Sequence, residues 1–349
     1  MATIVSEPDH APAPDRAVRL RTSVFTGRGA LLLPRHVTLV AFAVAVLVIG
    51  LTGSASTRYG LILATVYAIA IVGNNAIAST LNEINLSTTA FLALGSYITA
   101  NALERDQNIV VSLVLAVVGC AVVGFLVAIP TSRLGGIQTA LVTFALAYSV
   151  LDLASYLKDI TGGDNGKFVF VDTTIGDSVI SGSEPAMLIV AVASMVLVGL
   201  VHLRTLNSRA GRIAISVGES EQAAAVFGIR TRLVKVLVWT YASAIFGFAG
   251  FLLALTVGFV ASSQWTIMIA ILVFVGGLIG GTRSVTGAWI GGIVVAGMPL
   301  WLQNFIPASS TTIAFGLVLL VALLAGGKGL SELGERLAIN VYLRREGTK

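Results

Sequence analysis

The feature that most constrains this chain is its succession of long apolar segments. An α-helix needs ~20 mostly apolar residues to cross a bilayer, and 56% of the 349 residues are hydrophobic while 11% are charged. The pattern predicts an all-α, polytopic membrane protein with about ten transmembrane segments. They lie at about 37–53, 59–79, 87–103, 109–129, 137–157, 186–203, 234–260, 266–280, 285–305 and 311–326.

Two of these segments, 87–103 and 266–280, are short for a bilayer crossing of ~20 residues. Either they are tilted or extended by neighbouring residues, or they are broken and re-entrant, which would leave eight full spans. Short, glycine-interrupted segments in the two halves of a chain point to a transport path. Small residues also simply let helices pack closely, so both interpretations stay open.

The distribution of Lys and Arg predicts the orientation. With both ends inside, eighteen of the 22 basic residues fall on the cytoplasmic side, and only Arg58, Arg105, Lys158 and Lys167 fall outside. The positive-inside rule therefore favours cytoplasmic N- and C-termini, and it explains the net charge of +5 without nucleic acid. We expect residues 1–35, rich in Pro and charge, to be a disordered cytoplasmic tail without a signal peptide. Residues 36–327 would form the transmembrane domain, and 328–349 a cytoplasmic C-terminal tail.

The stretch 204–235 is the long polar interruption in the second half of the chain. Apolar residues recur through Ile213, Ile215 and Val217, and a second short helix is indicated by Ser220 as N-cap, with Gly228 as its C-terminal stop. A helix of about two turns is too short to be stable alone, so it must dock on something. Basic residues on both sides place the stretch in the cytoplasm. An ordinary solvated loop is the alternative interpretation.

Three short runs of this stretch form a distinctive pattern. They are Gly211-Arg212, the run 219–224 (Glu-Ser-Glu-Gln-Ala-Ala) and Gly228-Ile229. With this pattern the stretch resembles the cytoplasmic coupling loop of ABC importer permeases, and of the branched-chain amino acid permease family in particular. In that family the loop fits a cleft in the ATPase subunit. The resemblance therefore implies an ATPase-coupling site made of Gly211, Glu219, Glu221, Ala224 and Gly228. The sequence departs from the family at Val217-Gly218, where a basic residue is usual.

The largest predicted outer loop, about 158–185, begins with a glycine-rich stretch. Gly and Asn tolerate positive φ, so the residues by themselves predict only turns. A T-G-G-x-x-G pattern at this place is also typical of the branched-chain amino acid permeases, in which this surface meets a substrate-binding protein. The resemblance thus implies a binding-protein-facing loop. Its residues are Thr161, Gly162, Gly163, Asp164 and Gly166.

The last third of the chain is similar to a glycine-rich block of the same family, so the resemblance covers about residues 60–326. Glycines spaced by four, such as Gly276/Gly280 and Gly287/Gly291, allow backbones to approach closely. The sequence also departs from the family at 82–87, near a plausible translocation path. For that path we single out polar residues in the apolar spans, each of which could equally form a helix–helix hydrogen bond. They are Asn74, Asn75, Thr88 and Thr143.

Several kinds of chemistry are not indicated. The sequence has no P-loop, no G-x-S-x-G and no H-E-x-x-H pattern. A single cysteine, Cys120, and three scattered histidines predict neither a disulfide nor a metal site. We expect no ionisable group to be buried in the spans that follow Asp152, which argues against an ion-coupled carrier. Energy would instead enter through the central loop.

These observations predict a non-enzymatic permease subunit, without a cofactor, in a bacterial plasma membrane. The resemblance implies the following partners: cytoplasmic ATPase subunits, a second homologous permease, an extracytoplasmic solute-binding protein and the lipid bilayer. The substrate would be a branched-chain amino acid or a related small polar solute. A sugar or nucleoside permease of the same superfamily, an ion-coupled carrier and a non-transporting scaffold are the alternatives.

Overall fold

The computed structural model describes residues 32–170, 174–175, 178–303, 316–317 and 320. Most of the predicted N-terminal tail, the whole C-terminal tail and nearly all of the tenth apolar segment, 311–326, lie outside the described residues. The predictions made for them remain predictions.

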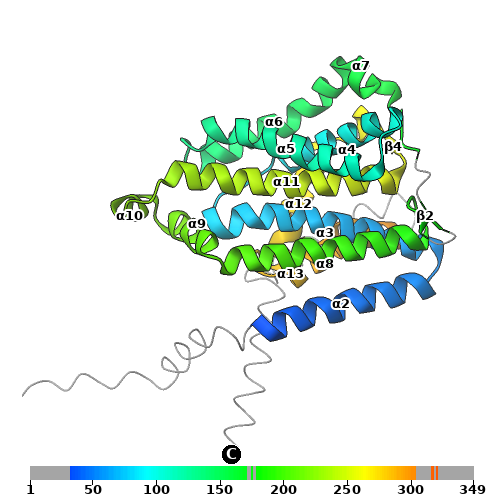
Figure 1. Cartoon of the computed structure of the whole chain (residues 1–349), viewed down its shortest axis with the longest axis horizontal. Coiled ribbons are helices and arrows are strands. Elements are labelled where there is room, and N and C mark those ends of the chain that lie inside the picture. The colour runs from blue at the N-terminus through cyan, green and yellow to red at the C-terminus, as the bar shows by residue number, and fades with distance from the viewer. Residues whose placement is uncertain (1–31, 171–173, 176–177, 304–315, 318–319, 321–349) are drawn as a thin grey trace, which may run out of the picture.

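Long helices make up most of the described chain (Figure 1). In chain order they are α2 (Leu32–Thr52), α3 (Ala55–Leu81), α4 (Thr88–Glu104), α5 (Ile109–Thr131), α6 (Gly136–Tyr156), α8 (Pro185–Asn207), α11 (Thr231–Val257) and α12 (Ile267–Gly280). The shorter helical pieces are α7 (Lys158–Thr161), η1 (Gly163–Asn165), α9 (Arg209–Glu219), α10 (Glu221–Val226), η2 (Ser262–Gln264), α13 (Val285–Gly292), the π-helical turn η3 (Ile293–Gly297) and α14 (Met298–Leu302). The all-α prediction is confirmed.

The described helices account for nine of the ten predicted apolar segments. Seven helical stretches are long and apolar enough to cross a membrane, with η2–α12 and α13–α14 each counted as one, while α2 has a shorter apolar stretch, Val37–Thr52. The two short segments differ from each other. The first is the continuous, mostly buried helix α4, and the second is α12, extended backward by η2. The exact number of crossings therefore stays a prediction.

Four two-residue strands lie at the end of the bundle that carries α7 (Figure 1). Strand β1 (Lys167–Phe168) pairs antiparallel with β4 (Phe259–Val260), and β2 (Thr174–Ile175) pairs with β3 (Ser178–Val179). The β1–β4 pair joins the glycine-rich loop to the end of α11. We call this end of the bundle the α7 end, and the opposite end, where α9 and α10 lie, the α10 end.

The core of the bundle is built on α3, which packs against α8, α11, α12 and α13. Helix α11 in turn packs closely on α5 through a stripe of small residues. Every fourth residue of α5 is buried there, at Ser112, Ala116, Cys120, Gly124 and Ala128. The opposite face of α5 exposes large apolar side chains, as expected of a helix that meets lipid.

The glycine block of the last third holds two helices together, as its spacing predicts. A Cβ added at Gly280 would fall on the carbonyl oxygen of Gly287, and one added at Gly291 on that of Gly276. Helices α12 and α13 therefore touch backbone to backbone. The close-packing interpretation of these glycines is confirmed.

Candidate coupling and transport sites

Helix α9 lies across the α10 end of the bundle and is anchored to it by glycines. Its N-terminus is capped by Ser208, whose hydroxyl oxygen accepts from the Gly211 amide at 3.2 Å. A Cβ at Gly211 would collide with the Thr205 carbonyl, and one at Gly218 with that of Thr80, at the end of α3. The departure from the family pattern at 218 is thus a position where α9 touches the backbone of α3.

The buried face of α9 differs in part from the one that the apolar pattern suggested. The helix buries Gly211, Ala214 and Val217, whereas Ile213 is exposed. Glycine stands at 211 and at 218 because the backbones of α8 and α3 come too close there for a side chain. The expected amphipathic helix is present, and its contact face combines small residues with Val217.

Helix α10 projects from the bundle (Figure 1) and has the predicted caps. The Ser220 hydroxyl accepts from the Ala223 amide at 3.2 Å, and Gly228 ends the helix region with a φ of 78°. Ala224 is buried against the bundle, whereas Val226 and Phe227 are each 85% exposed. The structure brings Glu219, Glu221, Ala224 and Gly228 together around this helix, while Gly211 lies on α9.

A buried lysine ties α10 to the bundle. Lys235 Nζ, near the start of α11, lies 2.8 Å from Glu221 Oε2 and 3.2 Å from Glu83 Oε1. The Lys235 and Glu83 side chains are each 6% exposed, against 45% for Glu221. The indole nitrogen of Trp239 donates to Glu83 Oε2 at 3.3 Å. We call Glu83, Glu221, Lys235 and Trp239 the lysine cluster.

The lysine cluster corrects the expectation that the later spans bury no ionisable group. Lys235 of α11 and His202 of α8 are both buried. Pairing with Glu83 and Glu221 compensates the loss of hydration of the lysine. In the sequence, Lys235 is one of the basic residues that flank the central stretch, and nothing local to Glu83 indicates a buried charge partner.

The pKa of Glu221 reflects the contact with Lys235. Burial raises this pKa, but the hydrogen bond and the positive charge of Lys235, helped by Thr231 and Arg232, lower it by more. The pKa therefore lies below its usual value, and the carboxylate stays ionised. The stabilisation by this contact is present above the ordinary glutamate pKa and is lost as the pH falls through the lowered value.

The segment Asn82–Ser87, which we call the 82–87 loop, connects the lysine cluster to two of the four predicted path residues. Asn85 Nδ2 donates to Asn74 Oδ1 at 3.3 Å, and the amide of Leu86 donates to Thr143 Oγ1 at 3.1 Å. Both Asn74 and Thr143 are buried. This segment is also one of the two that depart from the family pattern.

The other two predicted path residues lie elsewhere. Asn75 faces Gly277 of α12, and its Oδ1 has no hydrogen-bond partner among the described residues. Thr88, at the start of α4, is buried, and its hydroxyl likewise lacks a partner within the described part of the chain. None of the four path residues lines the cavity described next.

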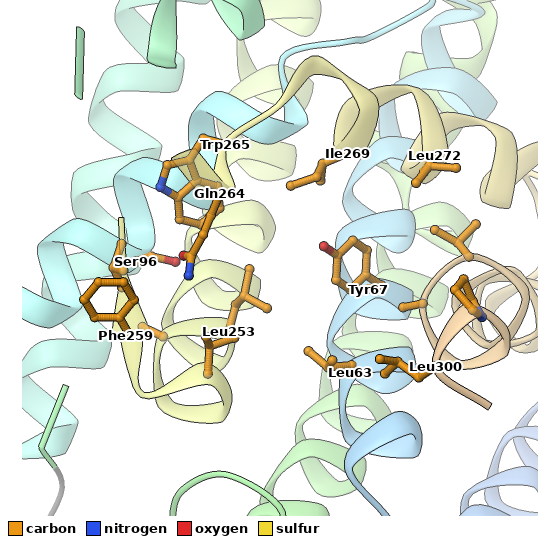
Figure 2. Close-up of a pocket in the computed structure, with 16 residues that line it drawn as sticks. Leu63, Tyr67, Ser96, Leu253, Phe259, Gln264, Trp265, Ile269, Leu272 and Leu300 are labelled. Carbon is orange, nitrogen blue, oxygen red and sulfur yellow. The ribbon is translucent and has the colours of Figure 1, made fainter. Parts of the chain in front are cut away.

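A cavity of about 470 Å³ lies between α3, α4, the end of α11, η2–α12 and η3–α14. Figure 2 shows Phe259, Gln264 and Trp265 on one side of it and Leu63, Tyr67 and Leu300 on the other. Most of its lining is aliphatic or aromatic, and Tyr67, Ser96, Gln264 and Trp265 supply polar atoms. These residues were missed at the sequence level because they come from five separate stretches of the chain.

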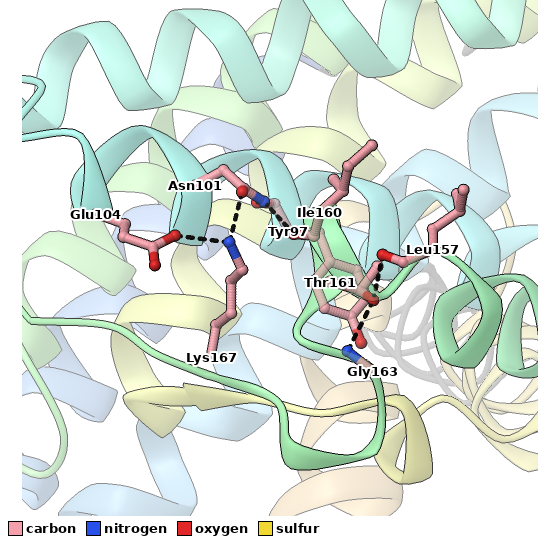
Figure 3. Close-up of polar contacts among 8 residues, drawn as sticks. All are labelled: Tyr97, Asn101, Glu104, Leu157, Ile160, Thr161, Gly163 and Lys167. Carbon is pink, nitrogen blue, oxygen red and sulfur yellow. Dashed lines mark hydrogen bonds and ion pairs between the residues drawn. The ribbon is translucent and has the colours of Figure 1, made fainter.

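The glycine-rich loop at the α7 end has the turns that its residues predict. Gly162, Gly163 and Gly166 all have positive φ. The Thr161 hydroxyl donates to the Leu157 carbonyl and accepts from the Gly163 amide (Figure 3). Asp164 lies in η1, between two of these glycines. The loop thus has a defined backbone.

A second lysine fastens this glycine-rich loop to α4. Lys167 Nζ lies 2.6 Å from Glu104 Oε2 and donates to Asn101 Oδ1 at 2.7 Å (Figure 3). Asn101 Nδ2 donates in turn to the Ile160 carbonyl at 2.7 Å. Next to it Phe168 contacts Phe170 and Phe259, so that an aromatic group stands at the surface of this end.

A bundle of apolar helices, a cavity among them and a short exposed helix at one end together define a multi-pass membrane transport protein. Comparison with protein families makes the class specific. The chain belongs to the family described as branched-chain amino acid transport system / permease component, whose model matches residues 56–325. It is therefore the non-catalytic membrane component of this inner-membrane ABC permease family.

The curated relatives agree on the family but differ in substrate. The chain is 27% identical to the high-affinity branched-chain amino acid transport system permease protein LivM of Escherichia coli, over 64% of this chain and 58% of the relative. It is 26% identical to the fructose import permease protein FruF of Bifidobacterium longum, over 61% of each. The probable branched-chain amino acid permease LivM of Methanocaldococcus jannaschii is 25% identical, over 55% of this chain and 56% of the relative. The matched region thus spans about three-fifths of these relatives. No solved structure matches the chain significantly.

Proposed function

We propose that this chain is the permease subunit of an ATP-driven importer, and that separate ATPase subunits move it through α9 and α10. The observation that carries the proposal is the exposed helix α10, with Val226 and Phe227 at its tip. An exposed apolar tip next to buried Ala224 is typical of a surface that another protein covers. The family membership and the coupling-loop pattern support the same partner.

The proposal extends to the rest of the assembly. The α10 end faces the cytoplasm, as the basic residues predict, and both termini lie on that side. The glycine-rich loop from Thr161 to Gly166 and the neighbouring aromatic group then face an extracytoplasmic solute-binding protein. A second permease subunit completes the membrane part.

For the substrate we propose a branched-chain amino acid. The cavity is lined mainly by apolar side chains, with few polar atoms beyond Tyr67, Ser96 and Gln264. An aliphatic side chain fits such a lining, and the few polar groups are then left for the ammonium and carboxylate at one end of the amino acid. A sugar carries hydroxyls over its whole surface, and each of them would need a hydrogen-bond partner when buried. Because a fructose permease is among the relatives, fructose is the second candidate that an experiment must include.

Asn74, Asn75, Thr88 and Thr143 remain our proposed path residues. They are buried in the conformation described here, so they would meet the solute only when the helices rearrange. Asn75 Oδ1 and Thr88 Oγ1 have no hydrogen-bond partner within the described residues, so these two atoms could bind a polar group of the solute.

The decisive experiment reconstitutes the chain with its ATPase, partner permease and binding protein in proteoliposomes. We expect ATP to drive uptake of radiolabelled leucine and not of fructose, and an ion gradient without ATP to drive neither. Uptake by the isolated chain under an ion gradient would instead establish a secondary carrier. Fructose uptake with no leucine uptake would transfer the assignment to the sugar permeases.

The orientation is tested by cysteine labelling in a Cys120→Ala background. Asp164→Cys should react with an impermeant thiol reagent added to intact cells, and Glu219→Cys should react only in inside-out vesicles. The reverse pattern would overturn the predicted sidedness of the whole bundle.

A further inference from the structure

The lysine cluster joins three separate parts of the chain at one atom. Lys235 belongs to α11, Glu221 to α10 and Glu83 to the 82–87 loop, and both carboxylates contact the same Nζ at 2.8 and 3.2 Å. A buried ammonium group without a carboxylate partner is strongly disfavoured. A displacement of α10 that leaves Lys235 in place must therefore break a contact or carry the other groups with it.

The 82–87 loop is short and held at both ends. Asn82 begins it with a φ of 55°, in the left-handed region. Two residues after Glu83, Asn85 accepts from the amide and the hydroxyl of Ser87 and donates to Asn74. Because only one residue separates Glu83 from Asn85, a movement of the Glu83 backbone should also displace the hydrogen bonds of Asn85.

Helix α9 reaches the same segment by a second route. Gly218 packs on the backbone of Thr80 and Leu81, directly before the 82–87 loop. The α9–α10 pair thus makes two contacts here, one with the backbone at the end of α3 and one, through Lys235, with the charge of Glu83. Trp239 holds the second oxygen of Glu83, so that carboxylate is fixed in one orientation.

We propose that Lys235 is a positioning residue that transmits the movement of α10 to the 82–87 loop, and through it to Asn74 and Thr143. This inference rests on the proposed function, because it requires an ATPase that moves α10. In this inference the movement passes through the ammonium group of Lys235, which contacts the carboxylates of both Glu83 and Glu221. Of the two contacts, the one to Glu221 is the exchangeable link, because Glu221 is the exposed partner.

The test uses the complete reconstituted complex and compares Lys235→Met with Lys235→Arg. Lys235→Met keeps an unbranched side chain of similar length but removes the charge, whereas Lys235→Arg keeps the charge. We expect Lys235→Met to lower the amount of leucine transported per ATP hydrolysed by about tenfold or more, within the usual range of coupling energies. Lys235→Arg should retain most of the wild-type ratio. Arg133→Met, which removes an exposed cation from the turn between α5 and α6, is the matched control and should leave the ratio unchanged.

A local readout separates transmission from general damage. In a Cys120→Ala background, Ile84→Cys places a thiol at an exposed position of the 82–87 loop. With wild-type Lys235, its labelling rate should change when ATP and vanadate trap the ATPase. With Lys235→Met the complex should still co-purify, but this nucleotide-dependent change should disappear.

A further variant covers the case in which Lys235→Met does not fold. Glu221→Gln removes only the exposed partner and leaves the buried Glu83–Lys235 pair intact, so it should insert normally and still reduce the nucleotide-dependent change at Ile84→Cys. Wild-type labelling and transport ratios in Glu221→Gln, or in an assembled Lys235→Met complex, would overturn the inference while leaving the proposed function standing. A wild-type complex in which ATP drives no uptake would overturn both.

Discussion

The two ends of the bundle each use a lysine to fasten a loop to a helix, but in different environments. At the α10 end, Lys235 and Glu83 are each 6% exposed, and a second carboxylate completes the group. At the α7 end the Lys167 and Glu104 side chains are 13% and 59% exposed. A buried ion pair is expensive to break, whereas an exposed pair contributes little because water and salt replace it.

The contrast fits different roles for the ion pairs at the two ends of the bundle. In the proposed mechanism, motion passes from α10 to the bundle, so a contact that cannot be lost without penalty is useful there. In the proposed assembly, the glycine-rich loop at the α7 end has to keep its shape while a partner protein approaches and leaves. Its turns and backbone hydrogen bonds do this, and Lys167 adds to them.

The largest effect is expected for Lys235→Met. Removal of the lysine leaves Glu83 buried without its charge partner, which should lower the free energy of unfolding by about 3–5 kcal/mol. Thermal unfolding of the purified protein in detergent measures the change. Adding Glu83→Gln should recover part of the loss, because the uncompensated charge is then gone, and a double variant as unstable as Lys235→Met would contradict the ion-pair explanation.

Gly218→Ala should have the next largest effect. The added Cβ collides with the backbone of Thr80, and overpacking of this kind costs roughly 1–3 kcal/mol. Gly135→Ala is the matched control, because nothing lies near the corresponding Cβ. Unfolding temperatures of the two variants check the comparison, and equal values would show that α9 does not press on α3.

Thr143→Val should have a smaller effect. The substitution keeps the shape of the side chain but removes the acceptor of the Leu86 amide. This site is only part-buried, so the cost should lie near the lower end of the ~1–3 kcal/mol that an unsatisfied buried donor costs. Faster hydrogen exchange at the Leu86 amide, with little change elsewhere, is the expected result. An unchanged exchange rate would remove Thr143 from the chain of contacts that starts at Lys235.

Lys167→Met is expected to have the smallest effect. Exposed ion pairs contribute about 0–1 kcal/mol, and the turns of the glycine-rich loop do not depend on the Lys167 side chain. Thermal unfolding at low and high salt should differ little from wild type. A loss as large as that of Lys235→Met would erase the distinction between the two ends.

The sequence predicts those features that depend on local chemistry. Apolar periods mark the helices, Ser220 and Gly228 mark the limits of α10, and glycines spaced by four mark the contact of α12 with α13. The positive φ values of Gly162 and Gly166 follow from the same local physics. These features are set by residues a few positions apart, so a single sequence is enough to find them.

What the sequence leaves out depends on residues that meet only in the folded chain. Trp239 and Glu83 are 156 positions apart, and nothing local to either residue indicates the contact. The cavity is likewise assembled from five stretches of chain. The buried face of α9 is only partly predictable for a related reason. Val217 follows the apolar pattern, but the proximity of the α3 backbone, rather than hydrophobicity, requires a glycine at 218.

The central claim is that an attached ATPase moves this bundle through α10. It is tested most directly by the double variant Glu221→Arg/Ala224→Lys in the reconstituted importer, with leucine uptake and ATP hydrolysis measured in the same vesicles. The account predicts that the variant inserts, that ATP hydrolysis continues or becomes independent of the solute, and that uptake is lost. Wild-type uptake per ATP hydrolysed in that variant would contradict it.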